Sequence, residues 1–438
     1  MKIPPRILVP VVGALSVTAA LLGFLWWQLN LSAAKLEQAS MNAANNTTAT
    51  ALATVQIPAV DDSVDRGDEA LLHLRQGDLL ALQGDWAGAQ TEFEKGVTAG
   101  GGLPALRKLA EAQLQRRDIA GVQSTIEKLK AAGARSEDLV LLQSLVLLRT
   151  GDVVKAGNLL TNAPESPHKH YGLALYHLIQ GHHTQVQDEL KIVQAGWDPT
   201  LRAYAHAIQS AYDEFALFPE SQEIHLQTLL AKALAEVREC DLALPLLHGV
   251  TEKQDDYRDA WVLQGFCELT TERYPQALSS LEHAYGLDPE KPETQYFLGR
   301  TYRALGDHKN ALTFLQYALQ NGLQPQDDVR RLIAAEALES GNSKLAVEQY
   351  RALSDVPDAK FDTNAKLVTA LISIGEHQEA YDRAKKVTTR WADNAQSWDL
   401  LGAAAASLEK KDEAKTAYQK ALQINPADAA AKEGLKKL

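Results

Sequence analysis

The chain has 438 residues, of which 45% are hydrophobic and 23% charged, with a formal net charge of -12 at pH 7. This acidic balance, with no block of Lys and Arg interleaved with aromatic residues, argues against nucleic acid as a partner, because phosphates would be repelled. Two cysteines are too few for a disulfide framework or a four-ligand zinc site.

The amino-terminal stretch reads as a membrane anchor. Residues 7–29 carry no charge, and as a helix they would reach about 34 Å, enough for a bilayer core of about 30 Å. Lys2 and Arg6 precede this segment, and a tryptophan pair lies at its far end, where aromatic side chains prefer the interface. We therefore expect residues 1–6 to be cytoplasmic, 7–29 to form a transmembrane signal anchor, and the remainder to be exported.

The segment that follows has the composition of a tether. Residues 30–67 are rich in Ala, Asn, Thr and Ser and lack apolar periodicity, which predicts a flexible linker. An alternative is a cleaved signal peptide with its cleavage site at Ser32–Ala34, giving a soluble periplasmic protein. Both alternatives place the rest of the chain in the periplasm of a bacterium, the first on the inner membrane.

Residues 292–325 show the unit from which most of the chain is built. Two runs with helical spacing of apolar residues flank a turn at Gly306–Asp307, which predicts two short amphipathic helices. Downstream, small residues recur at steps of 34 or 35: Gly265, Gly299, Ala334, Val368 and Gly402 in the first helix, and Ala277, Ala311, Ala346, Ala380 and Ala414 in the second. Such a period predicts an all-α solenoid of stacked helical hairpins, with small residues where helices cross closely.

The period divides the exported part into four ranges. Degenerate hairpins over 68–197 predict an amino-terminal array, and a loss of register over 198–223 predicts an irregular helical joint. Regular hairpins over 224–428 predict a carboxy-terminal array, and 429–438 reads as a capping helix with lysines near its end.

These hairpins resemble the tetratricopeptide repeat family, of the membrane-anchored type found in bacterial envelopes. The matching residues in one unit are Trp261, Gly265, Ala277, Leu281, Ala284 and Pro289, and in the last Trp398, Leu401, Gly402, Ala414, Tyr418, Ala421 and Pro426. In this family the first helix of each hairpin lines an inner groove. The resemblance maps that groove onto Phe266, Tyr296, Arg300, Arg303 and Arg331, and arginines beside aromatic rings suit an extended or helical peptide with acidic groups. Ordinary solvated positions are the alternative.

The family's carboxylate clamp for chaperones needs paired Lys and Asn on successive first helices. Here those places hold Val262, Phe266, Tyr296 and Arg300, which argues against that function.

The sequence shows no recognised catalytic or cofactor motif, so we expect neither an enzyme nor a cofactor, and no metal site. Histidines concentrate at His168, His170, His177, His182 and His183, where solvated helix ends are favoured over a zinc or copper site. Cys240 and Cys267 are expected to be buried thiols, with a disulfide as the alternative.

Together these observations predict a non-catalytic scaffold that binds other envelope proteins through its groove and the membrane through residues 7–29, with no small-molecule substrate. Such a scaffold would suit the assembly of pili, secretion systems, the outer membrane or cytochromes. The alternative is an accessory subunit of an exopolysaccharide synthesis and export complex, with Trp86, Trp197, Trp391 and Trp398 as candidate glycan platforms. An enzyme with a site around residues 195–223 is a third hypothesis.

Overall fold

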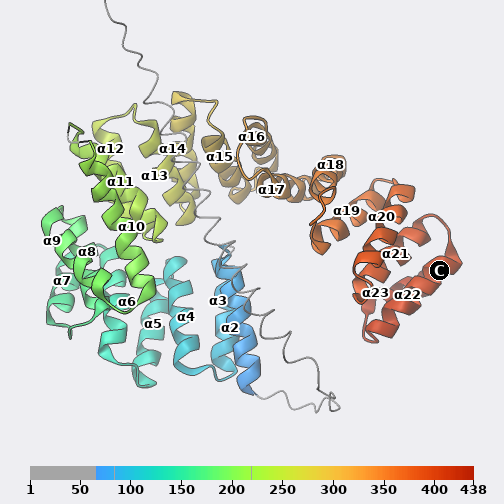
Figure 1. Ribbon diagram of the computed structural model, residues 1–438, viewed down its shortest axis with the longest axis horizontal. Helices are drawn as coiled ribbons and strands as arrows, with labels where there is room; N and C mark the ends of the chain where they lie inside the picture. The colour runs from blue at the N-terminus through green and yellow to red at the C-terminus, as the bar shows by residue number, and fades with distance from the viewer. Residues whose placement is uncertain (1–65, 83, 219) are drawn as a thin grey trace, which may run out of the picture. The chain divides into compact units, whose positions relative to one another are not determined.

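The computed structural model describes residues 66–82, 84–218 and 220–438 (Figure 1). The predicted signal anchor and nearly all of the predicted linker lie outside these residues. Within the described ranges, no helix is both long enough and apolar enough to cross a bilayer.

The described chain is all α-helical, and its helices form two compact units that divide after Ser280, inside α14. The helices of the first unit are α2 (Arg66–Leu82), α3 (Trp86–Thr98), α4 (Gly102–Gln115), α5 (Ile119–Ala131), α6 (Ser136–Arg149), α7 (Val153–Asn162), α8 (Pro167–Ile179), α9 (His183–Ala195), α10 (Pro199–Ala216), α11 (Glu223–Glu236), α12 (Cys240–Lys253) and α13 (Arg258–Thr270). The division falls within α14 (Tyr274–Leu287). The second unit continues with α15 (Pro292–Ala304), α16 (His308–Gln320), α17 (Gln326–Glu339), α18 (Ser343–Ser354), α19 (Phe361–Ser373), α20 (His377–Arg390), α21 (Ala395–Ser407), α22 (Lys411–Ile424) and α23 (Ala429–Lys437).

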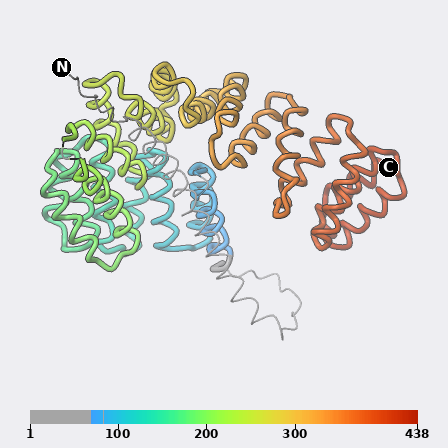
Figure 2. The backbone as a smooth tube through the Cα atoms, turned by 45° about the horizontal axis from the view of Figure 1, so that its top comes forward, coloured from blue at the N-terminus to red at the C-terminus, as the bar shows by residue number. Residues whose placement is uncertain are grey.

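Within each unit, successive helices pack as antiparallel hairpins, as Figure 2 shows along the tube. The turn at 306–307 shows why. Gly306 has a φ of 78°, a left-handed conformation that favours glycine and ends α15. Asp307 then caps α16, because its Oδ1 accepts a hydrogen bond from the backbone N–H of Asn310 at 3.0 Å. One helix is thus stopped and the next started within three residues.

Small residues lie where the two helices of a hairpin touch, as the period predicted. A Cβ atom at Gly299 would lie 2.7 Å from Cγ of Leu315, and one at Gly402 would lie 2.6 Å from Cε1 of Tyr418. Real Cβ atoms do not approach so closely, so a hydrogen atom is all that fits at these crossings.

The division between the units differs from the joint that the sequence suggested at 198–223. The 18-residue α10 fills most of that range, and Leu201, Ala205 and Ile208 on it are buried in the core of the first unit. One cluster of buried side chains continues through α10 from Leu114 to Cys267. The break in the repeat period at 198–223 therefore corresponds to one longer helix, α10, and the core of the first unit continues through it.

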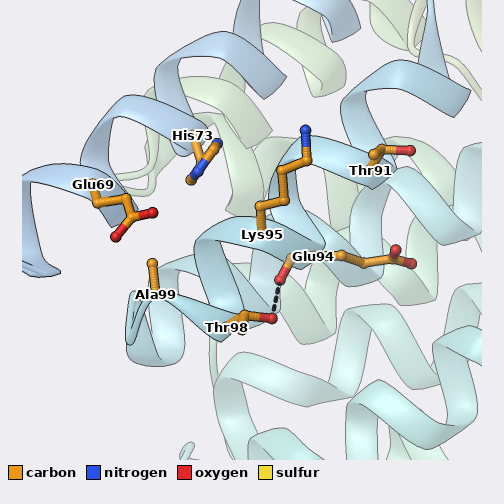
Figure 3. Close-up of a pocket in the computed structure, with 7 residues that line it drawn as sticks. All are labelled: Glu69, His73, Thr91, Glu94, Lys95, Thr98 and Ala99. Carbon is orange, nitrogen blue, oxygen red and sulfur yellow. Dashed lines mark hydrogen bonds between the residues drawn. The ribbon is translucent and has the colours of Figure 1, made fainter.

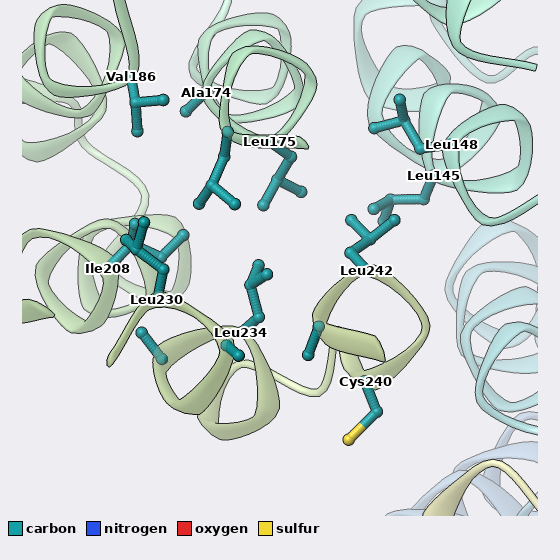
Figure 4. Close-up of a cluster of buried hydrophobic side chains, with 14 of the residues drawn as sticks. Leu145, Leu148, Ala174, Leu175, Val186, Ile208, Leu230, Leu234, Cys240 and Leu242 are labelled. Atoms are coloured by element: carbon teal, nitrogen blue, oxygen red, sulfur yellow. The ribbon is translucent and has the colours of Figure 1, made fainter. Parts of the chain in front are cut away.

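The first unit folds back so that distant parts of its sequence meet. Leu145 and Leu148 of α6 belong to the same buried cluster as Leu242 of α12 (Figure 4). Beside them the Arg149 side chain, 4% exposed, lies 3.1 Å from a Glu239 carboxylate oxygen and also donates a hydrogen bond to the backbone oxygen of Leu114 at 2.8 Å.

Asp241 extends this contact into a network. It forms ion pairs with Arg117 at 3.0 Å and Arg273 at 2.8 Å, and its second oxygen lies 4.0 Å from Arg149. Burial raises the pKa of Glu239, and the charge of Arg149 opposes that shift. We call Arg149, Glu239 and Asp241 the buried ion cluster. It fastens the ends of α4 and α6 to the start of α12, so these surfaces are already occupied by the chain itself.

In the second unit, α23 packs on the last hairpin through apolar side chains that include Ala431 and Leu435, and two carboxyl groups meet beside this contact. Asp428 caps α23 by accepting hydrogen bonds from the backbone N–H groups of Ala430 and Ala431 at 3.0 and 3.2 Å. Asp399 of α21 is 9% exposed and lies next to Asp428. Burial, followed by the neighbouring Asp428 carboxyl, raises the pKa of Asp399 to about 7.

This pair should make the last hairpin less stable as pH rises. The Asp399 carboxyl holds its proton in the folded state up to about pH 7, whereas its ordinary pKa is 3.8, so folding loses stability between these values and the loss is complete above pH 7. Asp399→Asn is expected to raise stability at pH 8 by about 1 to 3 kcal/mol and to have little effect at pH 4. Thermal unfolding at both pH values checks this, with exposed Asp393→Asn as the control. An equal effect of Asp399→Asn at both pH values would contradict it.

Candidate binding surface

The residues expected to line a groove in the second unit begin on α15. Tyr296, Arg300 and Arg303 are spaced by four and three residues, so they share one face of this helix. The Arg300 guanidinium carbon lies 5.6 Å from the centre of the Tyr296 ring, and Tyr296 is itself half-buried against Leu315 and its neighbours. A cation over a fixed aromatic ring is held in place while its N–H groups remain available.

Arg303 is engaged within the protein. Its Nε atom lies 3.1 Å from Oε2 of Glu336, which is 1% exposed on α17. The other carboxylate oxygen of Glu336, Oε1, is hydrogen-bonded to Nδ1 of His308. Arg303 and His308 together satisfy a buried carboxylate, so we assign Arg303 to holding the first helices of neighbouring hairpins together.

Arg331 also has a carboxylate partner, Asp328, at 3.3 Å on its own helix. Both side chains are more than 40% exposed, so this pair is weak and could open for a ligand. The adjacent Arg330, which no sequence pattern marked as a groove residue, donates a hydrogen bond to Oε1 of Gln349 at 2.9 Å. Of the arginines predicted for the groove in the second unit, Arg300 alone forms no ion pair among the described residues.

Phe266 lies in the other unit. It is half-buried on α13 and packs against the core of the first unit. The five predicted groove residues therefore do not form one site within a unit: Tyr296, Arg300, Arg303 and Arg331 belong to the second unit and Phe266 to the first.

The histidines of the hairpin formed by α8 and α9 form hydrogen bonds with nearby side chains of the first unit. His170 bonds to Glu189 at 2.6 Å and to Glu165 at 2.8 Å, and Nδ1 of His183 lies 2.9 Å from the hydroxyl of Tyr212. Burial lowers the pKa of His183. Across the described chain, no three His, Cys, Asp or Glu side chains are grouped so that they could hold a metal ion.

The two cysteines are free and buried. The hydroxyl of Thr270 donates to Sγ of Cys240 at 3.2 Å, and burial raises the pKa of the Cys267 thiol well above its ordinary value. Both features favour an unreactive thiol over a nucleophile.

An open cleft of about 670 Å³ lies between α2 and α3 (Figure 3). Its lining residues are Glu69, His73, Thr91, Glu94, Lys95, Thr98 and Ala99. The Thr98 hydroxyl donates to the backbone oxygen of Glu94 at 2.9 Å, and Lys95 and His73 hold the pKa of Glu92 below its usual range. These polar groups bind one another, so the arrangement resembles a solvated helix surface more than a site.

The tryptophans proposed as glycan platforms differ in what they contact. Trp86 lies 5.1 Å from the guanidinium of Arg238, and Trp391 lies 4.6 Å from that of Arg390. The indole N–H of Trp398 donates to the backbone oxygen of Ala392 at 2.7 Å. Trp197, by contrast, is 75% exposed.

Comparison with known proteins identifies the repeats. Residues 228–292, 269–336 and 395–428 match models of the tetratricopeptide repeat. The peroxisomal targeting signal receptor of Eremothecium gossypii is 22% identical over 234 residues, covering 51% of this chain and 39% of the receptor. That of Candida albicans is 26% identical over 233 residues, covering 51% of this chain and 38% of the receptor. The chain thus spans about two fifths of the length of these relatives.

Solved structures that are similar to parts of this chain include YrrB and PilW. YrrB, described as a tetratricopeptide repeat protein with an unusual peptide-binding site, is 19% identical and covers 44% of this chain and 98% of its own, with a TM-score of 0.39. PilW, described as a type IV pilus biogenesis factor, is 18% identical and covers 49% and 99%, with a TM-score of 0.34. The repeat matches, together with the stacked hairpins, identify residues 228–336 and 395–428 as tetratricopeptide repeats.

Proposed function

We propose that this chain is a non-catalytic scaffold whose second unit binds an acidic segment of a partner protein on the face of α15. Repeats of this family serve protein–protein interaction, and the arrangement of Arg300 over Tyr296 is the observation that carries the assignment to this face. The ring positions the guanidinium, and the absence of an ion pair to it among the described residues leaves its donors for a carboxylate.

The neighbouring ion pairs support this proposal by setting the rigidity of the face. Arg303 and buried Glu336 connect α15 with α17, so the two first helices are held in a fixed relation. A preorganised surface loses little entropy when a partner binds. The weak Arg331–Asp328 pair on α17 supplies a second cation that a longer acidic segment could recruit.

We further propose that the protein works in a bacterial envelope, anchored to the inner membrane through residues 7–29 with its repeats in the periplasm, where it recruits or orders components of an assembly. The uncharged 23-residue segment with preceding basic residues supports this. Alkaline extraction of membranes tests the anchor, since a peripheral or cleaved form would be released. The polysaccharide-export alternative has less support, because only Trp197 of the four candidate tryptophans is largely exposed.

Charge reversal at Arg300 should weaken partner capture by about tenfold, because an acidic segment would then face a carboxylate in place of a guanidinium. The measurement is recovery of crosslinked partners from membranes with the wild-type chain and with Arg300→Glu. Lys309→Glu is the matched control, since Lys309 is exposed on the second helix of the same hairpin. Equal recovery with Arg300→Glu and the wild type would remove the assignment to this face.

A further inference from the structure

The first described helix of the stack, α2, is apolar on two opposite faces. Its inner face carries Ala70, 3% exposed, and Gly77, where a Cβ atom would lie 2.3 Å from the Phe93 ring. Its outer face carries four leucines that are about half exposed, namely Leu71 at 46%, Leu72 at 53%, Leu79 at 57% and Leu82 at 54%. We call these four residues the leucine stripe.

The stripe is compact on the helix surface. With about 100° of rotation per residue, its four leucines fall within an arc of roughly 100°, centred opposite the buried face. Among the described helices, no other carries more than one large hydrophobic side chain exposed to this degree. A helix that is apolar on opposite faces is normally covered on both.

We propose that the leucine stripe is the interface of a two-fold symmetric dimer, in which α2 of one copy packs antiparallel on α2 of a second copy. A two-fold contact requires a self-complementary surface, in which each residue meets a different residue of the partner. If the two-fold axis passes midway between residues 76 and 77, Leu71 of one copy lies opposite Leu82 of the other. The same axis brings Arg75 of one copy opposite Asp78 of the other. Antiparallel packing in this register therefore places Leu71 against Leu82 and Arg75 against Asp78 of the second copy.

The charged residues beside the leucine stripe favour a second copy of the chain as the partner over an unrelated apolar surface. Arg75 is exposed within the arc of the stripe, and Asp78 is 44% exposed at its edge, where it also binds Lys108 at 2.6 Å. A hydrophobic partner would have to bury Arg75 without a counter-charge, whereas in the dimer the Asp78 of each copy would lie opposite the Arg75 of the other.

The area sets the strength of the contact. Four half-exposed leucines offer on the order of 300 to 400 Å² of apolar surface per copy, less than the roughly 800 Å² per partner of a standard interface. The dimer should therefore be weak in dilute solution and should be populated where copies are concentrated. This inference does not depend on the binding surface of the second unit.

Disulfide crosslinking of the full chain tests the register. Two differently tagged forms, Leu71→Cys and Leu82→Cys, are mixed and oxidised; the native cysteines are buried and do not compete. The mixed product is expected to exceed each same-site product by at least about fivefold, because residues 71 of the two copies would be separated by about 16 Å along the helices. Leu79→Glu added to both forms is expected to reduce the mixed product about tenfold.

Three results would overturn the proposal. Equal yields of mixed and same-site products would show random collision. Absence of crosslinks, with Leu79→Glu lowering the melting temperature, would show that another part of the same chain covers the stripe. Absence of crosslinks with an unchanged melting temperature would show that the stripe faces water.

Discussion

Replacing Arg149 by methionine is expected to destabilise the first unit by about 3 to 5 kcal/mol, because it leaves the carboxylate of Glu239 buried without its counter-charge. Glu239 is only 4% exposed, so water cannot replace the lost partner. The substitution also removes the hydrogen bond from Arg149 to the backbone oxygen of Leu114, which then keeps the bond from the backbone N–H of Arg117.

Urea unfolding followed by circular dichroism measures this loss, and hydrogen exchange locates it. The amides of α6 and α12 should lose protection first, since the buried ion cluster joins these two helices across some 90 residues of sequence. The double variant Arg149→Met with Glu239→Leu is expected to recover much of the stability, because it removes both charges of the pair.

Arg135→Met provides the control for removal of an arginine. Arg135 is 69% exposed and pairs with Asp138 on the surface, where water screens the charges, so its loss should leave the stability of the unit nearly unchanged. If Arg149→Met proved as mild as Arg135→Met, the ion cluster would not hold the first unit closed.

Replacing Gly299 by leucine is expected to destabilise the second unit by about 2 to 4 kcal/mol through overpacking. The new Cβ atom would lie 2.7 Å from Cγ of Leu315 and 3.1 Å from its backbone nitrogen. A side chain could rotate away, but the backbone contact can be relieved only by separating α15 from α16. Because each hairpin is stabilised by its neighbours, we expect exchange protection to fall in the adjacent helices as well.

Gly286→Leu is the matched control for this substitution. Gly286 also lies in a helix, and a Cβ atom there meets no other side chain or distant backbone atom within 4 Å. Leucine has a higher helix propensity than glycine, so Gly286→Leu should be neutral or stabilising by up to about 1 kcal/mol. Comparable melting temperatures for Gly299→Leu and Gly286→Leu would mean that Gly299 is not at a tight crossing.

The repeated part of the fold could be predicted from sequence because it depends on local patterns. Gly299 and Gly402 recur at the period of the hairpin, and the structure places both against the partner helix. The turn at Gly306–Asp307 was visible for the same reason, since its glycine and its helix cap are adjacent in the chain.

The buried ion cluster could not be predicted in this way. Arg149 and Glu239 are related by no repeat period, and they meet only because the first unit folds back on itself. The sequence shows each as an ordinary charged residue near a helix end. A pattern that describes neighbouring hairpins contains no information on which distant hairpins come into contact.

The candidate site was predictable only in part, because the sequence shows cations without showing their partners. Arg300 and Arg303 are alike in sequence, yet one stacks on Tyr296 and the other pairs with buried Glu336 from the next hairpin. Phe266 was grouped with them on the family's pattern, and it lies in a different unit. Of the predicted residues, Tyr296 and Arg300 are therefore the pair on which our proposed binding face rests.

Site-specific photo-crosslinking at Glu293 tests the proposed binding face most directly. Glu293 precedes Arg300 by two helical turns, so a photoreactive residue there would lie on the same face of α15. We expect a partner adduct from position 293, none from position 309 on α16, and loss of the adduct when Arg300→Glu is added. An adduct that forms equally from both positions, or that persists with Arg300→Glu, would contradict it.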